Sequence, residues 1–267
     1  MITQAPSTES SVDYESLTEI AGEEVSQEQV DRMVHRYCWA ASYCSGKDII
    51  EVACGSGQGL GHLGKVARSL RAGDVSPALV STVKRIYGEG FPVQVLDAHH
   101  LPFPDRSADV ILLFEAIYYL RSPDDFLVEC ARVLRPGGKV LVATANKDLY
   151  DFNPSPHSHF YFGAADLPGL FARHDFSVRL FGDTPIEAVS VRQRILRPLK
   201  KLAVSLNLMP RTMSAKRILK RLVFGQMVSM PERLEIPPGE VFEGPEIPAG
   251  EPDRRHKVIL CEATLTA

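Results

Sequence analysis

The residues best suited to binding chemistry are three acidic side chains in the first half of the chain. Glu51 lies in the apolar run 48–53, Asp74 follows it by 23 residues, and Asp97 comes 23 residues later. Each acid belongs to or ends a β-branched run typical of a strand, so the spacing matches one strand–helix unit. A carboxylate in such a place can accept hydrogen bonds from both hydroxyls of a ribose. The three acids therefore predict a site for a nucleoside-containing ligand.

A glycine-rich turn follows the first predicted strand. Its sequence, EVACGSGQGLG, places Gly55, Gly57 and Gly59 before a predicted helix, where glycine permits positive φ and close approach to a ligand. The dinucleotide fingerprint GxGxxG needs a glycine at position 60, which is Leu60 in this chain. The turn therefore argues against a pyrophosphate-binding nicotinamide site. The alternative is a glycine-rich turn that binds no ligand.

Predicted strands and helices alternate around these residues. The expected strands are 48–53, a short run within 69–76, 91–98, 108–120, 139–145, 177–182 and 257–265, and the expected helices are 59–70, 77–88, 123–134 and 164–176. Alternation of this kind predicts a mostly parallel sheet with helices on both faces. Ligands of such sheets bind beyond the carboxyl ends of the strands, which is where the acids and the glycine-rich turn lie.

Four segments, in this order, carry a resemblance to a known family: EVACGSGQG, GDVSPALV, DAHHLPFPDRSADVILLFEAIYYL and RVLRPGGKVLVAT. Together they resemble the class I S-adenosylmethionine-dependent methyltransferases, of the small-molecule, methyltransferase-11-like type, over about residues 35–182. The resemblance implies S-adenosyl-L-methionine as the cofactor. It also implies a Rossmann-like, seven-stranded, mostly parallel sheet of order 3-2-1-4-5-7-6, with the seventh strand antiparallel and a helical insertion before it.

The resemblance also implies roles for individual residues. Glu51 and the backbone at the glycine-rich turn would hold the methionine part, Asp74 the ribose, and Asp97 with its neighbour the adenine. The expected cofactor-binding residues are Tyr37, Glu51, Ala53, Cys54, Gly55, Gly57, Asp74, Val75, Asp97, Ala98, Phe114 and Glu115. For Cys54 simple packing is the favoured interpretation. The segment HRYCWAA at 35–41 could form a lid with Arg36 or Tyr37 near the cofactor carboxylate, or a helix that packs Tyr37 on the sheet.

The segments after the fourth and fifth strands narrow the choice of acceptor. Enzymes that methylate nucleobase amino groups commonly have an NPPY-like motif after the fourth strand, where this chain has FEAIYYL, so that class is disfavoured. A hydroxyl acceptor usually needs a general base. The expected catalytic residues are His157, His159 and Tyr118, and the other candidates are Tyr119, Tyr161, His99 and His100.

The favoured function is therefore methyl transfer to a small molecule, at an oxygen of a sugar or secondary metabolite. The loop 151–162 is similar to loops of methyltransferases in polysaccharide or secondary-metabolite assembly. The alternatives are C- or N-methylation of a quinone or polyketide, a non-catalytic S-adenosylmethionine-binding protein, and a nicotinamide-dependent oxidoreductase.

Composition and charge complete the prediction. The 267 residues carry a net charge of −3, so no uniform cationic field indicates nucleic acid. The five cysteines have no CxxC spacing, which favours reduced thiols in a cytoplasmic protein and no metal site. The N-terminal segment lacks the features of a secretion signal, and no apolar run is long enough to span a bilayer.

Four regions are expected along the chain. They are an acidic, flexible tail at 1–30, a cofactor-binding core at 31–185, a basic helical insertion at 186–230, and a Pro-rich segment with the final strand at 231–267. The basic residues at 192–221 could cover the acceptor site, contact anionic lipid, or bind an anionic acceptor.

Overall fold

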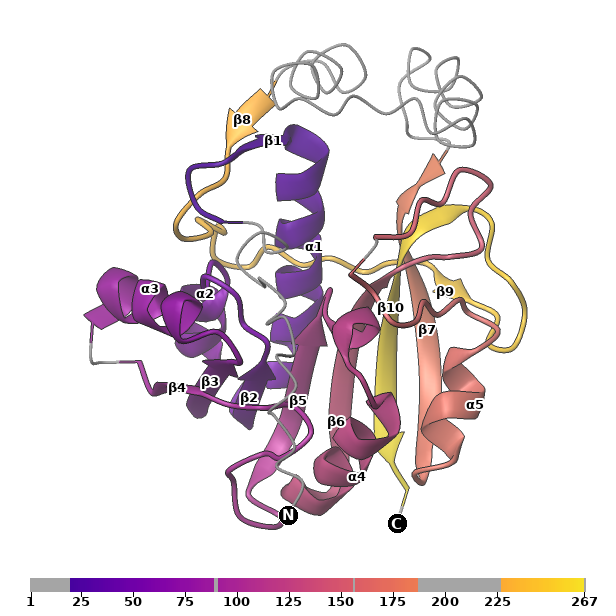
Figure 1. The fold of residues 1–267 in the computed structure, drawn as a ribbon, viewed down its shortest axis with the longest axis horizontal. Helices are drawn as coiled ribbons and strands as arrows, with labels where there is room; N and C mark the ends of the chain where they lie inside the picture. Colours follow the sequence, from indigo (N-terminus) through magenta and orange to yellow (C-terminus); the bar gives the residue numbers. More distant parts are fainter. Residues whose placement is uncertain (1–19, 89–90, 156, 187–226, 267) are drawn as a thin grey trace, which may run out of the picture.

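An eight-stranded sheet forms the centre of the protein (Figure 1). The computed structural model describes residues 20–88, 91–155, 157–186 and 227–266. The strands, in spatial order, are β4 (Val93–Val95), β3 (Ser69–Asp74), β2 (Asp48–Val52), β5 (Ala108–Phe114), β6 (Leu134–Ala145), β10 (His256–Leu265), β7 (Phe176–Pro185) and β9 (Glu246–Ile247). Neighbours from β4 to β6 pair in parallel, and β10 pairs antiparallel with both β6 and β7. The predicted fold class and order are confirmed, and β9 is an additional edge strand.

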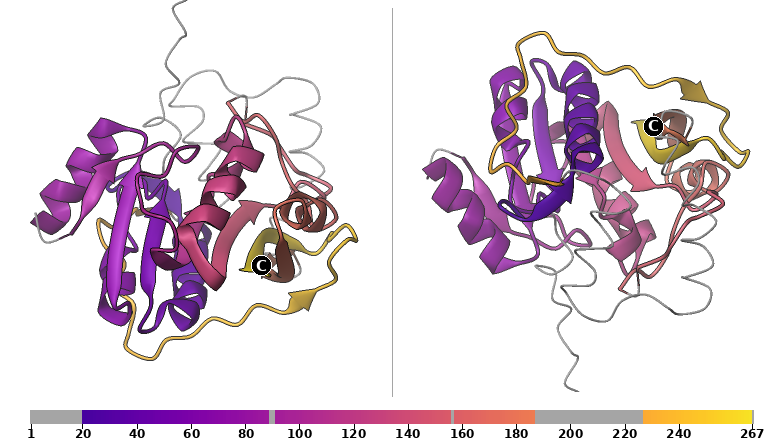
Figure 2. Two further views of the ribbon diagram at one scale, coloured as in Figure 1. Left: turned by 90° about the horizontal axis from the view of Figure 1, so that it is seen from below. Right: turned by 90° about the horizontal axis from the view of Figure 1, so that it is seen from above.

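Helices cover both faces of this sheet (Figure 2). They are α1 (Gln27–Cys44), α2 (Leu60–Val66), α3 (Pro77–Tyr87), the 3-10 helix η3 (Ile117–Tyr119), α4 (Pro123–Val133) and α5 (Leu167–Ala172). The first three pack in one hydrophobic cluster, and α4 and α5 pack in the other. This layering explains why β5 is apolar along almost its whole length, since both of its faces are buried.

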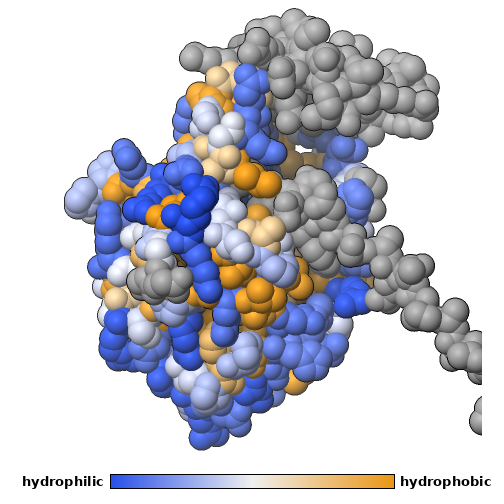
Figure 3. Space-filling model, turned by 60° about the vertical axis from the view of Figure 1, so that its left-hand side comes forward, coloured by the Kyte–Doolittle hydropathy of each residue, from blue (hydrophilic) through white to orange (hydrophobic). Residues whose placement is uncertain are grey.

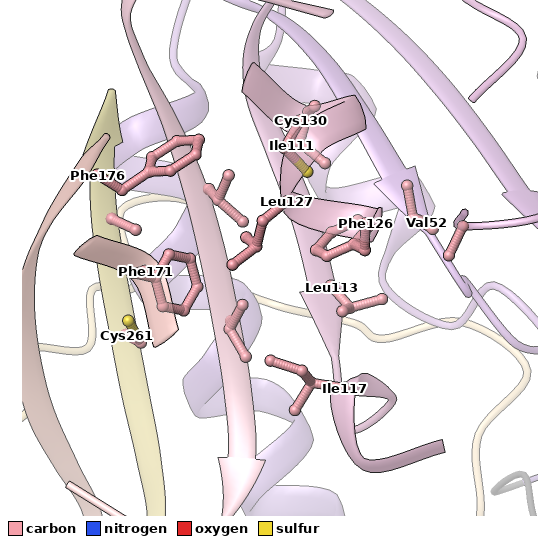
Figure 4. Close-up of a cluster of buried hydrophobic side chains, with 14 of the residues drawn as sticks. Val52, Ile111, Leu113, Ile117, Phe126, Leu127, Cys130, Phe171, Phe176 and Cys261 are labelled. Carbon is pink, nitrogen blue, oxygen red and sulfur yellow. The ribbon is translucent and has the colours of Figure 1, made fainter. Parts of the chain in front are cut away.

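The two faces of the central strands supply the two cores in alternation. Ile111 and Leu113 belong to the cluster with α4, where they lie near Phe126 and Leu127 (Figure 4). Leu112 belongs to the cluster on the opposite face. Successive side chains of a strand point to opposite faces, so one strand serves both layers and holds its carboxyl end rigidly.

Serine caps fix where the helices begin. Ser76 accepts a hydrogen bond from the backbone of Leu79 at the start of α3, and Ser122 caps α4 in the same way. Ser26 and Gln29 form a reciprocal capping box at the start of α1. These caps place the helix starts beside the carboxyl ends of the preceding strands.

Several boundaries differ from the prediction, and three of them have a clear structural cause. Strand β1 (Glu24–Ser26) pairs with β8 (Met227–Ser229), so the end of the predicted tail 1–30 is regular structure. The predicted strand 108–120 stops at Phe114, because Glu115 has a φ of 51° and η3 follows. The predicted strand 91–98 is only β4, because the chain turns where Asp97 bridges to His100.

Other expectations lie partly outside the described residues. The predicted insertion falls mostly at 187–226, which the structure does not describe. All five cysteines are free and buried. Within the described parts of the chain, no helix is both long and apolar enough to cross a membrane. On the face shown in Figure 3, hydrophobic residues gather near the middle between hydrophilic regions.

Candidate functional site

A cavity of about 490 Å³ lies at the carboxyl ends of β2, β3 and β5. Helix α1 forms one wall, and the turn after β5 with η3 forms another. Of the residues predicted from the sequence, the cavity is lined by Tyr37, Glu51, Ala53, Gly55, Asp74, Val75, Asp97, Ala98, Phe114, Glu115 and Tyr118. The fold therefore brings together residues that are up to 81 positions apart, from Tyr37 to Tyr118.

Glu51 is the most deeply buried acid of this cavity, with 1% of its surface exposed. Tyr37 of α1 donates a hydrogen bond of 2.5 Å to Glu51 Oε1. Burial raises the pKa of the Glu51 carboxyl to about 7, although the bond from Tyr37 and the charge of Arg36 act in the opposite direction. The other carboxylate oxygen, Oε2, is buried and has no hydrogen-bond partner among the described residues. A buried carboxylate oxygen of this kind suits a cationic group of a ligand.

The glycine-rich turn bends sharply around the end of β2. Ala53, Gly55 and Gly57 have φ values of 55°, 58° and 81°. Gly59 has an ordinary φ but no room for a side chain, because an added Cβ would lie 2.1 Å from the ring of Tyr37. The third glycine of the ExxxGxGxG pattern thus lets α1 pack on the turn and holds Tyr37 against Glu51.

Tyr87 at the end of α3 braces the same turn from outside the cavity. Its hydroxyl donates to the carbonyl of Gly57 at 2.8 Å and accepts from the amide of Gly61 at 3.2 Å. The Arg233 guanidinium lies 4.6 Å from the centre of the Tyr87 ring, and the amide of Leu234 donates to the carbonyl of Gln58. The segment after β8 therefore supports the turn, a contact that no motif of the sequence predicts.

Asp74 closes the turn at the end of β3. Its carboxylate accepts hydrogen bonds of 3.0 Å from the amides of Gly55 and Ser76. Burial raises the pKa of Asp74, although these hydrogen bonds oppose the shift. Val75 beside it lines the cavity and is 45% exposed, so it offers an apolar surface next to a carboxylate.

Asp97 and His99 form a pair at the end of β4. His99 Nδ1 lies 2.6 Å from Asp97 Oδ1, and the amide of Ser122 donates to His99 Nε2 at 3.3 Å. Both ring nitrogens of His99 are therefore engaged. Burial raises the pKa of Asp97, but the hydrogen bonds from His99 outweigh it, and the net shift is downward.

Glu115, Tyr118 and Arg36 meet on the side of the cavity next to Phe114. Tyr118 donates to Glu115 Oε2 at 2.8 Å, and Arg36 Nη1 lies 3.8 Å from Glu115 Oε1. Burial and the charge of Glu115 raise the pKa of Tyr118, so this side chain is a phenol that donates. Phe114 meets the ring of Tyr37 edge to face at 5.4 Å.

Four predicted residues do not line the cavity. Cys54 is buried, and burial raises the pKa of its thiol, which agrees with the packing interpretation. Gly57 faces Val83 and Leu60 instead. His157 and His159 are exposed on the loop after β6, so the structure does not bring these expected bases to the cavity. The abundance of His and aromatic residues in that loop therefore did not indicate which way its side chains point.

Several lining residues were missed by the sequence prediction. Helix α1 contributes Gln29, Arg32 and Met33, and the chain after η3 contributes Arg121. Gln29, Arg32, Met33 and Arg36 have the i, i+3, i+4, i+7 spacing of one helix face. That spacing could have indicated a shared surface, but not which ligand it faces.

The donor set fits S-adenosyl-L-methionine. That cofactor carries an ammonium, a carboxylate and a sulfonium, together with an adenosine. The cavity offers Glu51 Oε2 for a cation, Arg36 for an anion, and Asp74 with the apolar Val75 for a nucleoside. Across the described ranges of the chain, no group of three or more His, Cys, Asp or Glu side chains is arranged to hold a metal ion.

Comparison with known proteins agrees with the resemblance to methyltransferases. Residues 50–142 match the family described as Methyltransferase domain. A probable S-adenosylmethionine-dependent methyltransferase of Mycolicibacterium smegmatis is 35% identical over 158 residues, which is 55% of this chain and 56% of the relative. An O-methyltransferase of Penicillium expansum, cnsE, is 29% identical over 64% of each chain. The match to the first of these relatives thus spans little more than half of its length.

Solved structures show the same fold. The YcgJ protein of Bacillus subtilis aligns with a TM-score of 0.58 and 15% identity, covering 88% of this chain and 99% of that one. This likeness shows the fold. The resemblance to the class I S-adenosylmethionine-dependent methyltransferases is confirmed by the match of residues 50–142 to a methyltransferase domain and by the relatives named as such. The expected cofactor, S-adenosyl-L-methionine, is confirmed with it at the level of the family.

Proposed function

We propose that this chain transfers a methyl group from S-adenosyl-L-methionine to an oxygen of a small-molecule acceptor. The observation that carries the proposal is the unpartnered, buried Glu51 Oε2 in a cavity that also contains Asp74 and Arg36. A relative named as an O-methyltransferase supports oxygen as the acceptor atom, and a sugar or secondary metabolite is the proposed acceptor.

Each end of the cofactor has a proposed partner. Glu51 holds the ammonium, Arg36 the carboxylate, and Asp74 the ribose hydroxyls. Asp97 and the backbone at Ala98 hold the adenine edge, with Val75 against its face. Phe114 and Glu115 lie beside the sulfonium. Bound in this way, the cofactor supplies an electrophilic methyl group.

The contribution of the protein is then mainly positioning. Methyl transfer is an in-line displacement, so the acceptor oxygen, the methyl carbon and the sulfur must lie on one line. When the acceptor oxygen is ionised, its negative charge and the positive charge of the sulfonium are neutralised as the bond forms, and a cavity that excludes water strengthens the electrostatic attraction between them.

The Asp74→Ala variant tests the cofactor site. We expect the affinity for S-adenosylhomocysteine to fall at least tenfold, as is usual when hydrogen bonds to a charged group are lost. Isothermal calorimetry measures this affinity. Asp125→Ala on the exposed first turn of α4 is the matched control and should leave the affinity within twofold of the original protein. Unchanged affinity in Asp74→Ala, with a folded protein by circular dichroism, would show that the ribose assignment is wrong.

A further inference from the structure

The cavity has a cationic side that the cofactor assignment does not use. One face of α1 presents Arg32 and Arg36 to the cavity, and Arg121 lies on its rim after η3. Arg36 is paired with Glu115 and is the proposed partner of the cofactor carboxylate. Arg32 is half-buried and Arg121 exposed, and neither has an ion pair or hydrogen bond within the described residues.

The acidic residue one helical turn before Arg32 is bound by another cation. This residue, Glu28, is bound by Lys257, whose amine lies 2.7 Å from both carboxylate oxygens of Glu28. Arg32 also lowers the pKa of Lys257, although burial is the largest cause of that shift. Lys257 and Arg32 therefore lie near Glu28 at this end of α1, and Glu28 is bound by the lysine, which Asp151 also stabilises in its charged form.

Apolar side chains also line the cavity, beside these arginines in the sequence and at the end of β6. Met33 follows Arg32 on α1 and is buried, and Leu120 precedes Arg121. Ala145 at the end of β6 adds a third apolar contact. A molecule with an anionic group and an apolar body would match both the arginines and the apolar side chains of this lining.

With Glu51, Asp74 and Asp97 assigned to the cofactor, no other described lining carboxylate or histidine is free to act as a general base. His99 is the one histidine in the described lining, and both of its ring nitrogens are engaged, by Asp97 and by the amide of Ser122. Glu115 already accepts from Tyr118 and pairs with Arg36. An acceptor that is ionised before it binds needs no base at all.

We infer that the acceptor is a carboxylate on an apolar body, oriented by Arg32 and Arg121, and that the product is its methyl ester. This inference rests on the proposed function. One carboxylate oxygen forms a bond to the methyl carbon while the bond from that carbon to the sulfonium sulfur breaks. The sulfur keeps the electron pair and becomes the neutral thioether of S-adenosylhomocysteine. No proton is transferred, and one positive and one negative charge are removed together.

The test compares medium-chain and aromatic carboxylic acids with the alcohol and the primary amide of the same carbon skeleton. Binding of S-adenosylhomocysteine is measured first by calorimetry, because its failure would reject the proposed function itself. Given that binding, we expect methyl esters of the acids by mass spectrometry and no product from the alcohols or amides. Equal or greater turnover of the alcohols, or no turnover of any acid, would overturn the inference while leaving the cofactor site intact.

Variants of the two arginines test the inference through KM for the acid, which a change in fold stability alone would not raise. Arg32→Gln and Arg121→Gln should each raise KM for the acid about tenfold, because each removes a charged hydrogen bond, and leave the affinity for S-adenosylhomocysteine within twofold. Arg32→Lys, which keeps the positive charge, should raise KM less than Arg32→Gln does. Arg173→Gln, on an exposed arginine that pairs with Asp124 away from the cavity, is the matched control. Unchanged KM in both cavity variants would contradict the proposed orientation of the carboxylate.

Discussion

Burial of the Glu51 carboxylate destabilises its ionised form in the folded protein, and the same burial leaves an oxygen available to a cationic ligand. A carboxyl pKa of about 7 means that, in the protein without ligand, Glu51 is mostly a neutral acid below about pH 7. The direction in which stability changes with pH follows from the difference between the folded and unfolded pKa values. A carboxyl whose pKa is raised on folding stabilises the fold below its unfolded pKa, and this contribution is lost as the pH rises through about 7. A bound ammonium would restore a partner for the ionised form.

The affinity for S-adenosylhomocysteine should therefore depend on pH. Below the pKa of Glu51 the ammonium must compete with a proton, so raising the pH from about 6 to about 8 should tighten binding about tenfold. Calorimetry across this range measures the change. Glu51→Gln should bind more weakly and lose the pH dependence. Glu129→Gln, whose carboxylate lies outside the cavity lining, should keep it. A flat profile in the original protein would contradict the role given to Glu51.

The three expected acids line the cavity, whereas the expected bases His157 and His159 do not. Glu51, Asp74 and Asp97 are set by the strand–helix repeat, because the carboxyl ends of neighbouring parallel strands meet at one edge. His157 and His159 depend on the path of a loop, which the composition of that loop does not determine. Arg32 was missed because one charged face of a helix is most often solvated.

Among the elements, the turn between β2 and α2 depends most directly on α1. Gly59 has no space for a Cβ because the ring of Tyr37 fills it, and Tyr37 in turn bonds Glu51. The sequence predicted the turn from its glycines, but the need for the third glycine became visible only with α1 in place. Close packing at this point transmits any displacement of the turn to the acid.

Gly59→Ala should therefore affect both stability and binding. The added methyl overlaps the Tyr37 ring, so we expect a loss of about 1–3 kcal/mol in the free energy of unfolding. The affinity for S-adenosylhomocysteine should fall as well, because Tyr37 moves away from Glu51. Urea denaturation and calorimetry measure the two effects. Gly169→Ala in α5, where a Cβ meets nothing within 4 Å, is the control and should not destabilise the protein. Equal behaviour of the two variants would show that the contact with Tyr37 is unimportant.

For the whole molecule, segments far apart in the sequence meet around α1. Strand β1 pairs with β8 (Figure 1). Lys257 binds Glu28, and His35 Nδ1 lies 2.8 Å from Asp183 Oδ1. The family resemblance implied the sheet order, in which the last strand, β10, lies antiparallel between β6 and β7. The β1–β8 pair and the Arg233 brace had no local signal, because they join residues more than 140 positions apart. The roles expected for the basic residues at 192–221, as a cover of the acceptor site or a lipid contact, stay predictions.

The most direct measurement is a calorimetric titration of the purified protein with S-adenosylhomocysteine, with NADH as the comparison ligand. We expect binding of S-adenosylhomocysteine with a dissociation constant on the order of micromolar and no detectable binding of NADH. Binding of NADH alone, or no binding of S-adenosylhomocysteine by a folded protein, would contradict the assignment of the cavity as a methyl-donor site.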